Sequence, residues 1–282
     1  MQVYAFNKNQ NRVFVEAAEQ ASDYSCLECG QTVRKRGGLH KQLHFYHLHP
    51  ETSCRLNGKS AEHIAIQRYL KNLLGETCEE EVAFPHIGRI ADIVWFSKNL
   101  IFEVQCSPIT ADEVRARIAD YEKAGFQVIW ILHEAEFCKK RVSASTLWLQ
   151  NHTHYFAEND FLSTPAIYDF CPVILRQKRL GSFLKRPIDL SQIQKRKRVK
   201  TVASLPTYMH KRVELWNYFV SGDLLEAIEN NELHIFDEAN QFEASFSGNK
   251  TQEKSSLTEK LLQPFFRLFK SIYYYLIEQS TR

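Results

Sequence analysis

The pattern of hydrophobic and polar positions predicts a hairpin and then a helix in the first part of the chain. "MQVYAF" and "RVFVEA" alternate between apolar and polar residues around the turn-like "NKNQN", which is typical of a β-hairpin. From Ser60 the apolar residues recur at helical spacing, and Ser60 is itself a good N-cap. Gly75 is a typical residue at the end of a helix. We therefore expect a helix that begins at Ser60 and ends at Gly75.

The next part of the chain alternates between strand and helix patterns. Thr110, with Glu113 three residues later, has the spacing of a capping box, and the helix that it opens ends at Gly125. A continuous apolar run follows and is typical of a fully buried strand after a crossover helix. The order helix, three strands, helix, strand predicts an α/β core with an antiparallel meander and a parallel strand behind it. The strand patterns occupy residues 78–84, 89–96, 100–106 and 126–132.

Beyond about residue 140 the pattern is weaker. Residues 143–175 fit either strands or loop, and 176–200, which contain Pro187, resemble a linker. The run "LTEKLLQPFFRLFKSIYYYLIEQ" predicts a helical end with a break near Pro264, so we expect a mainly helical C-terminal region.

Two acidic residues interrupt the predicted central strands, Asp92 on one and Glu103 on the next. Burial of a lone carboxylate is costly unless it is paired with a cation or binds a metal. With Lys98–Asn99 as a two-residue turn, Asp92 pairs with Gln105, and all three polar side chains project from one face. A three-residue loop would put them on opposite faces. We therefore predict a loop of even length.

Two carboxylates on one face of a rigid sheet favour a divalent cation between them. Mg²⁺ typically takes one or two carboxylates and completes its shell with water and phosphate oxygens. Such an ion can activate a water and stabilise the charge that builds on a phosphodiester. The alternative is a purely structural pairing of Asp92 and Glu103 with Arg89, Arg115 or Arg117.

Further polar residues surround this pair in the predicted core. Glu62, at the start of the first helix, is a candidate third acid, and His63 lies beside it. Arg117 and Tyr121 are four residues apart on the second helix, hence on one face. Each of them alone is more typical of a surface or packing residue. Together with the D-x10-E-x-Q spacing they form a rarer set.

A cysteine and histidine cluster precedes the first helix. Cys26 and Cys29 form a C-x2-C pair, whose thiolates can hold one side of a Zn²⁺ ion. The alternative is a histidine-rich loop beside two free thiols. The second pair of ligands must come from His40, His44, His47, His49 or Cys54.

Composition and charge add a candidate partner. The 282 residues are 44% hydrophobic and 24% charged, as in ordinary soluble proteins, and neither a signal pattern nor a membrane-spanning run occurs. We therefore expect a cytoplasmic protein, in which an odd count of seven cysteines argues against a disulfide framework. The net charge is +3, yet residues 176–200 contain ten Lys or Arg and one Asp. This basic segment, with Lys195, Arg196, Lys197 and Arg198 at its densest part, favours nucleic acid as a partner, although a solvated linker would look the same.

Four stretches resemble the competence protein CoiA family, a branch of the PD-(D/E)xK restriction-endonuclease-like nucleases. They are "SAEH", "RIADIVWF", "IFEVQCSPIT" and "RIADYEKAGFQVIWIL". The earlier "YSCLECGQTVRKRGGLHKQLHFYHL" is similar to the zinc-binding N-terminal part of that family. The resemblance covers roughly residues 1–140. It implies a restriction-endonuclease-like core in residues 58–140, after an N-terminal β-hairpin and zinc module in 1–57 and before a C-terminal region in 141–282.

The resemblance also implies roles for the residues above. Glu62, Asp92, Glu103 and Gln105 would form the catalytic site, with Asp92 and Glu103 as ligands of Mg²⁺ or Mn²⁺. His63, Arg117 and Tyr121 would support that site near the DNA. Gln105 departs from the broader superfamily, which has lysine there. The family's "HFxH…C" pattern favours His47 and Cys54 as the second pair of zinc ligands, with His44 as the first substitute.

The resulting expectation is a metal-dependent deoxyribonuclease with a structural Zn²⁺, which handles incoming single-stranded DNA in natural transformation and meets recombination or competence proteins. An alternative of another class is a DNA-binding adaptor without catalysis that recruits recombination proteins. A more remote one is a zinc-dependent protein-interaction scaffold that docks through the aromatic residues near 265–275.

Overall fold

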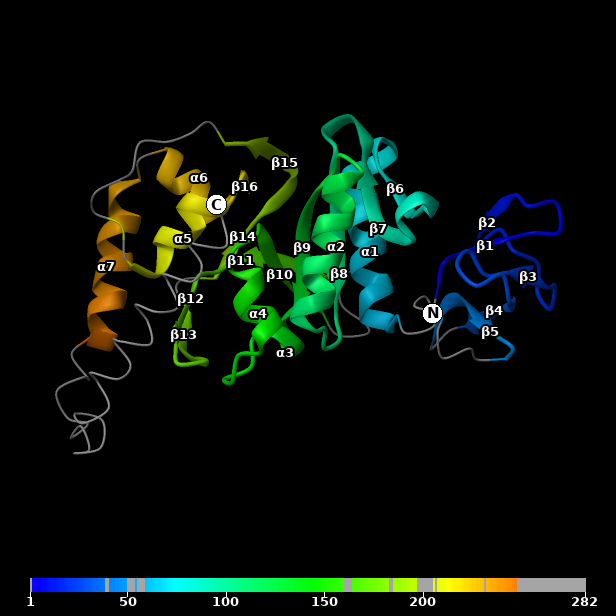
Figure 1. Ribbon diagram of the computed structural model, residues 1–282, viewed down its shortest axis with the longest axis horizontal. Coiled ribbons are helices and arrows are strands. Elements are labelled where there is room, and N and C mark those ends of the chain that lie inside the picture. Colours follow the sequence, from blue (N-terminus) through cyan, green and yellow to red (C-terminus); the bar gives the residue numbers. More distant parts are fainter. Residues whose placement is uncertain are drawn as a thin grey trace, which may run out of the picture. The chain divides into compact units, whose positions relative to one another are not determined.

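The computed structural model describes residues 2–38, 41–49, 54, 59–159, 164–182, 185–196, 205, 207–230 and 232–247. These residues form a mixed α/β protein with one five-stranded sheet, one seven-stranded sheet and two two-stranded sheets (Figure 1). The chain divides into two units, residues 1–239 and 240–282. The second unit holds the end of α7 (Leu233–Ser247) and residues outside the described ones.

The five-stranded sheet forms an N-terminal module in the order β2-β1-β3-β4-β5. Its first two strands are antiparallel, with Ala5 opposite Val13, so the predicted hairpin is confirmed. Val3, Ala5, Val33 and Phe45 form the core of the module and are fully buried. The strands are β1 (Tyr4–Phe6), β2 (Arg12–Phe14), β3 (Tyr24–Ser25), β4 (Thr32–Gly38) and β5 (Lys41–His47).

Two capped helices flank the central strands. The hydroxyl of Ser60 accepts a hydrogen bond from the amide of His63 at the start of α1 (Ala61–Leu74), and Gly75, with φ of 69°, ends that helix. The Thr110 hydroxyl accepts from the amide of Glu113 at the start of α2 (Ala111–Lys123). Both predicted helix starts are therefore confirmed, because each depends on a local side chain that binds free backbone N–H groups.

The seven-stranded sheet has the order β14-β11-β10-β9-β8-β7-β6. The pairs β6–β7 and β7–β8 are antiparallel, whereas β8–β9 and β9–β10 are parallel. The meander with a parallel strand behind it, expected from the sequence, is thus present. Trp130 and the flanking apolar residues of β9 are fully buried, as expected for a strand covered on both faces. The strands are β6 (Glu79–Phe84), β7 (Arg89–Trp95), β8 (Leu100–Gln105), β9 (Gln127–His133), β10 (His154–Glu158), β11 (Ala166–Asp169) and β14 (Arg186–Pro187).

The prediction of a mainly helical C-terminal region was wrong for the described residues, which contain seven short strands after residue 141. The linker interpretation of 176–200 was wrong as well, because this segment holds β13 (Lys178–Ser182), β14 and β15 (Asp189–Lys195). Pro187 pairs with Tyr168 on the last strand of the sheet, where a missing N–H is tolerated. Strands of two to seven residues leave little alternation to detect. The remaining elements are α3 (Glu134–Phe137), α4 (Ala144–Leu149), β12 (Pro172–Leu175), β13 (Lys178–Ser182), β15 (Asp189–Lys195), α5 (Thr207–Leu215), β16 (Tyr218–Ser221) and α6 (Leu224–Glu229).

Other expectations meet the structure only in part. The central sheet continues across residue 140 into β10, β11 and β14, and the predicted boundaries 57/58 and 140/141 stay predictions. The helical end around Pro264 lies outside the described residues. Within the described ranges, no helix is both long and apolar enough to cross a membrane. All seven cysteines lie in described positions and are free thiols, as expected.

Candidate functional site

The loop between the two acid-bearing strands has an even length, as predicted. It contains four residues, 96–99, and a single 3-10 turn closes it with Asn99 in the left-handed conformation at φ of 53°. The prediction of a two-residue turn was wrong. Trp95 therefore pairs with Leu100, two positions away from the expected register.

This register places Asp92 opposite Glu103, where Gln105 was expected. The parity is unchanged, so Asp92, Glu103 and Gln105 still project from one face. Asp92 is 4% exposed and Glu103 is 1% exposed. The two acids are thus buried neighbours on facing strands.

Both acids line a pocket of about 150 Å³. Its wall combines acidic, basic and amide side chains, with few apolar residues. The lining residues are Glu28, Lys59, His63, Arg89, Ile90, Asp92, Glu103, Val104, Gln105, Ser107, Arg117 and Tyr121.

Each oxygen of Asp92 has a partner. Its Oδ1 accepts from Lys59 Nζ at 2.7 Å and lies 3.0 Å from His63 Nε2, and its Oδ2 accepts from the amide of Val104 at 2.9 Å. Burial alone would raise the pKa of Asp92, but the charges of His63 and Lys59 outweigh it and lower the pKa. Asp92 is therefore ionised, and the hydrogen bond that it accepts from the Val104 amide of β8 fixes its orientation.

Two side chains of α2 donate hydrogen bonds to Glu103. Its Oε1 accepts from the hydroxyl of Tyr121 and its Oε2 from Arg117 Nη1, both at 2.7 Å. Burial raises the pKa of Glu103, Arg117 opposes that rise, and the negative charge of Asp92 adds to it. The predicted common face of Arg117 and Tyr121 is confirmed. The two acids repel each other across the hairpin, which a cation between them would relieve.

The other arginines of the structural alternative bind elsewhere. Arg89 donates to Glu113 and Asp120, and Arg115 donates to Asp112. Of the three arginines considered, only Arg117 pairs with an acid of the hairpin.

Lys59 is a pocket residue that sequence reasoning missed. Its Nζ donates to Asp92 at 2.7 Å, to the side-chain oxygen of Gln67 at 3.0 Å and to Glu81 at 3.2 Å. Its side chain is 10% exposed. A lysine just before an N-cap carries no periodic signal, so the sequence pattern is that of a surface residue.

Glu81 lies at the position of β6 opposite Asp92, because the register is continuous from the Glu80–Ile93 pair to the Val82–Ala91 pair. Its φ of 48° is a left-handed conformation, which is uncommon for a residue other than glycine. Its side chain reaches Lys59. The Glu81 carboxylate also accepts from the amide of Tyr4 at 3.3 Å, and it thereby joins the N-terminal module to the pocket.

Glu62, the predicted third acid, does not line the pocket. Its pKa is lowered by hydrogen bonds from its own backbone amide and from Ser60. Its neighbour His63 contacts Asp92 instead. Gln105 lines the pocket as predicted, and its amide nitrogen donates to the backbone and side-chain oxygens of Ser107.

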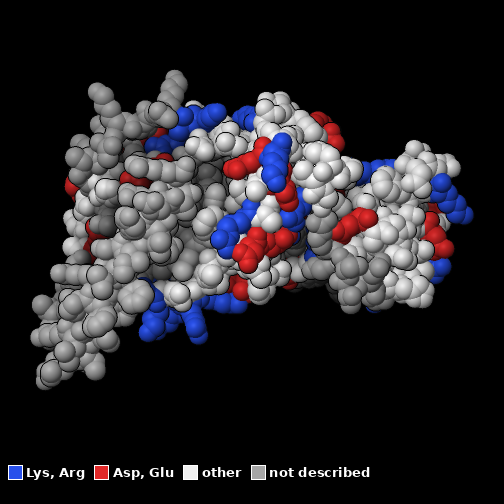
Figure 2. Space-filling model, in the orientation of Figure 1, with Lys and Arg blue, Asp and Glu red and all other residues white. Residues whose placement is uncertain are grey.

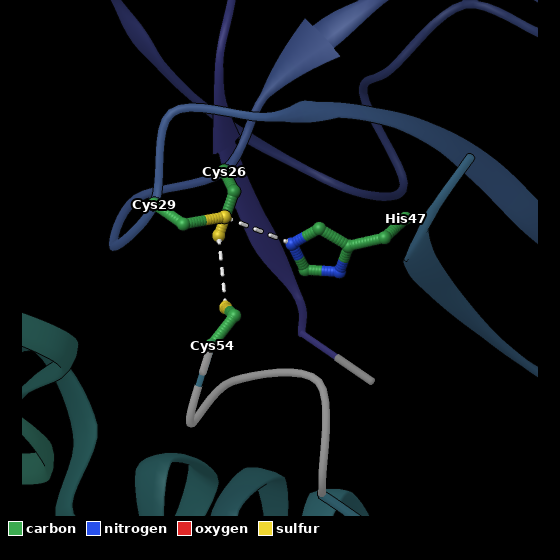
Figure 3. A group of neighbouring side chains, drawn as sticks. All are labelled: Cys26, Cys29, His47 and Cys54. Carbon is green, nitrogen blue, oxygen red and sulfur yellow. Dashed lines mark hydrogen bonds between the residues drawn. The ribbon is translucent and has the colours of Figure 1, made fainter. Parts of the chain in front are cut away.

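Cys26, Cys29, His47 and Cys54 converge in the N-terminal module (Figure 3). Their ligand atoms all lie within 4.8 Å of one another. Cys26 Sγ is 3.7 Å from Cys54 Sγ, and Cys29 Sγ is 3.3 Å from His47 Nε2. The four predicted ligands therefore form a cluster that can hold a metal ion. His44, the predicted substitute, is buried but lies outside this cluster.

The turn between β3 and β4 shapes this cluster. Cys26 donates its amide to Gln31 and accepts from the amide of Gly30, whose φ of 70° suits glycine. Burial raises the pKa of Cys26 and of Cys54, so both thiolates need a cation nearby. Three sulfurs and one imidazole nitrogen are the donor set of structural zinc sites. Glu28, in the same turn, accepts from Cys54 Sγ and also lines the acid pocket.

The predicted DNA-binding basic residues differ in their surroundings. Lys195 is exposed at the end of β15. The side chain of Arg196 is 8% exposed and donates to Glu229 and to the carbonyls of Val213 and Trp216, so its assignment as a DNA contact was wrong in this structure. Lys197 and Arg198 lie outside the described residues.

A second group of exposed basic side chains lies in the segment after α3 and in the β12–β13 hairpin. Figure 2 shows Lys and Arg gathered there, whereas charges of both signs mix over α2. The backbone joins the two segments, since the Arg179 amide donates to the Lys140 carbonyl. We call this group the hairpin basic patch: Lys139, Lys140, Arg141, Arg176 and Lys178.

The family described as competence protein CoiA, nuclease-like domain, matches residues 51–215. This range contains every residue that lines the acid pocket except Glu28. No curated protein and no solved structure matches the chain.

Proposed function

The chain belongs to the competence protein CoiA family, whose nuclease-like domain matches more than half of it, and from this premise we propose that the acid pocket cuts phosphodiester bonds of DNA with the help of a divalent metal ion. In this proposal the helix, meander, helix and parallel strand of residues 61–133 form a restriction-endonuclease-like core. The reaction takes place in the cytoplasm, on DNA that enters during transformation, and single strands are the preferred substrate.

The observation that carries this proposal is the acid pair itself. Asp92 and Glu103 are buried opposite each other, and the pocket that they line also contains Gln105. A protein keeps two repelling carboxylates in one pocket at a cost in stability, which a bound cation offsets. Because the domain is nuclease-like in sequence, metal-dependent cleavage is a function that would require this pair of carboxylates.

The residues fit Mg²⁺ or Mn²⁺. Burial and the charge of Asp92 raise the pKa of Glu103, and a divalent cation held by both acids would favour its ionised form. Both residues offer carboxylate oxygens, the ligands that these hard ions prefer. Asp92 and Glu103 would hold the ion, which supplies activation of a water and stabilisation of negative charge on phosphate.

The surrounding side chains fix the geometry of the acids. Tyr121 and Arg117 bind one oxygen of Glu103 each, and the Val104 amide binds Asp92. Because carboxylate oxygens carry two lone pairs, these bonds orient both groups and still leave acceptor sites. Gln105 would orient the attacking water through its amide, and the role of Glu62 as a further acid stays a prediction.

The Cys26, Cys29, His47 and Cys54 cluster would hold a structural Zn²⁺. Four protein ligands close the coordination shell, so no position remains for a reacting water. The hairpin basic patch and Lys195 would contact phosphates along the DNA, which makes binding weaker as the salt concentration rises.

The test is cleavage of labelled single- and double-stranded DNA with Mg²⁺ or Mn²⁺. Asp92→Asn and Glu103→Gln keep the size of each side chain and remove its charge. We expect each to lower the cleavage rate by about 100-fold or more. Asp112→Asn is the matched control, since Asp112 is 89% exposed on α2, outside the pocket, and should cleave like the unchanged protein.

Equal cleavage by all four proteins would contradict this site. DNA binding without cleavage in any metal would favour a second function, a DNA-binding adaptor that recruits recombination proteins. One observation favours this second function: Lys59 and Arg117 already form ion pairs with Asp92 and Glu103 without a metal.

A further inference from the structure

Gln105 is neutral and lies where the broader nuclease superfamily has a positively charged lysine. Lys59 is a lysine of the same pocket and can supply this charge. Two of its hydrogen-bond partners, Gln67 and Glu81, are buried and do not line the pocket. Another partner, Asp92, lines the pocket. Lys59 is therefore anchored by two buried side chains and also donates to an acid of the pocket wall.

We propose that Lys59 is the phosphate-binding catalytic residue of this pocket, whose ammonium group donates to a non-bridging oxygen of the phosphodiester that is cut. This inference rests on the proposed nuclease function and adds a residue to it. When the phosphate binds, Lys59 breaks its hydrogen bond to Asp92 and donates to the phosphate oxygen instead. Asp92 keeps its hydrogen bond from the Val104 amide.

The two other strong cations of the pocket are committed to acids. Arg117 donates to Glu103 and Glu113, and Arg89 donates to Glu113 and Asp120. Each guanidinium is thus held by two carboxylates, as Lys59 is by Asp92 and Glu81, but when Lys59 turns away Asp92 keeps its hydrogen bond from the Val104 amide. An ammonium group is a compact point charge with donors that can be redirected by rotation of one bond. Lys59 is the better suited of the three to follow a phosphate group.

The reaction needs such a donor because negative charge stays on the phosphate oxygens throughout. A water oxygen forms a bond to phosphorus, and the bond from phosphorus to the leaving sugar oxygen breaks. The leaving oxygen gains a proton from solvent, and the attacking water loses one to solvent. Lys59 keeps its proton and stabilises the charged oxygen in the transition state.

The anchor at Glu81 ties this residue to the N-terminal module. Glu81 accepts from both Lys59 and the Tyr4 amide. The module therefore contributes to the position of the ammonium group through the side chain of Glu81.

Two measurements on Lys59→Met test the proposal. The first is the rate of metal-dependent cleavage, which we expect to fall by about 100-fold or more, as for loss of one transition-state donor. The second is binding of uncleaved single-stranded DNA in chelator at several salt concentrations. Loss of one phosphate contact should lower the slope of log affinity against log salt by about 0.7. Lys71→Met is the matched control, because the ammonium of Lys71 binds the carbonyls of Gly75 and Cys78 away from the pocket.

The outcomes separate this inference from the proposed function. An unchanged cleavage rate or an unchanged salt slope in Lys59→Met overturns the role of Lys59. If the unchanged protein cleaves nothing while the slope still falls, the nuclease function fails and Lys59 remains a phosphate ligand of a DNA-binding protein.

Lys59→Met removes a cation from buried acids and could therefore destabilise the fold. A second variant controls for this effect. Lys59→Met combined with Glu81→Gln removes one positive and one negative charge together. Glu81→Gln alone is its control, since the amide oxygen still accepts from Lys59. We expect the double variant to fold, as thermal unfolding measures, and to lose cleavage and the slope contribution. Glu81→Gln alone keeps the ammonium group and should lower the cleavage rate less than the double variant does. Equal behaviour of the two variants would overturn the proposal.

Discussion

At the scale of single residues, the buried polar groups of this protein differ in what compensates them. Asp92 has a lysine, a histidine and a backbone amide around it, whereas His154 is buried and its ring binds backbone carbonyl groups. The Nδ1 of His154 lies 2.8 Å from the His152 carbonyl, and its Nε2 has no partner among the described residues. His154 packs against Phe156 and Trp216. It is therefore held in the neutral form.

Burial lowers the pKa of His154 to about 3, and this predicts a loss of stability in acid. Protons bind the unfolded histidine below its normal pKa of about 6.5 but not the folded one, so stability is complete above that pH and falls below it. At pH 5 the unfolding free energy should be lower by about 2 kcal/mol than at pH 7.5 on this account. Denaturant unfolding of the unchanged protein and of His154→Phe at both pH values measures the difference. Parallel losses in the two proteins would contradict it.

Residue-level prediction from the sequence worked where an acid interrupts an apolar strand. Asp92 and Glu103 stand out in that way, and so do Cys26 and Cys29 through their spacing. Lys59 and Glu81 could not be found, because their meeting depends on contact between distant segments and on the left-handed φ of 48° at Glu81, which a sequence pattern does not reveal. Arg196 was misassigned since a run of basic residues looks the same whether its members are exposed or buried.

At the scale of elements, sequence signals that depend on neighbouring residues predicted the structure more reliably than features that depend on distant segments. The caps at Ser60 and Thr110 require only neighbouring residues, and both are present. The parity of the hairpin loop follows from the alternation of the strands, but its length does not, because Asn99 adopts a left-handed conformation that the pattern cannot reveal. The short strands of the C-terminal half owe their place to pairing with distant segments.

The turn that carries Cys26 and Cys29 gives an element-scale prediction. Purified protein should contain about one zinc per chain, and Cys26→Ser or Cys54→Ser should lose it, because the four ligands form one closed site. Removal of zinc by chelator should also lower the melting temperature, since the binding free energy contributes to folding of the module. Metal analysis and thermal unfolding measure both. Cys138→Ser is the control, as Cys138 lies outside the cluster, and an equal zinc content in all variants would rule the site out.

At the scale of the whole molecule, a buried ion pair joins the C-terminal half to the central sheet. Arg212 on α5 donates to both oxygens of Asp169 on β11, at 2.6 and 2.7 Å. Arg212 is 4% exposed and Asp169 is fully buried. The Leu224 amide at the start of α6 donates to the same carboxylate. Three elements thus meet at one acid, which explains how short helices and strands after residue 141 keep a fixed arrangement within residues 1–239.

Removal of one partner from this pair should be costly, because the other is left as an unpaired buried charge. We expect Arg212→Met to lower the unfolding free energy by about 3–5 kcal/mol. Arg141→Met, at an exposed position of the hairpin basic patch, should change it by less than about 0.5 kcal/mol. Chemical denaturation of both variants measures these values. A small loss in Arg212→Met would mean that Asp169 does not organise this region.

The composition of the acid pocket has a consequence for base identity. Two rings line it, those of His63 and Tyr121, and both are buried and hydrogen-bonded to Asp92 and Glu103. Proteins engage unpaired bases by stacking them on exposed ring faces, which buried rings do not offer. In the proposed function a strand meets this pocket mainly through charged and polar side chains. The positions of cuts along a strand of mixed composition should therefore be spread evenly over adenine, cytosine, guanine and thymine.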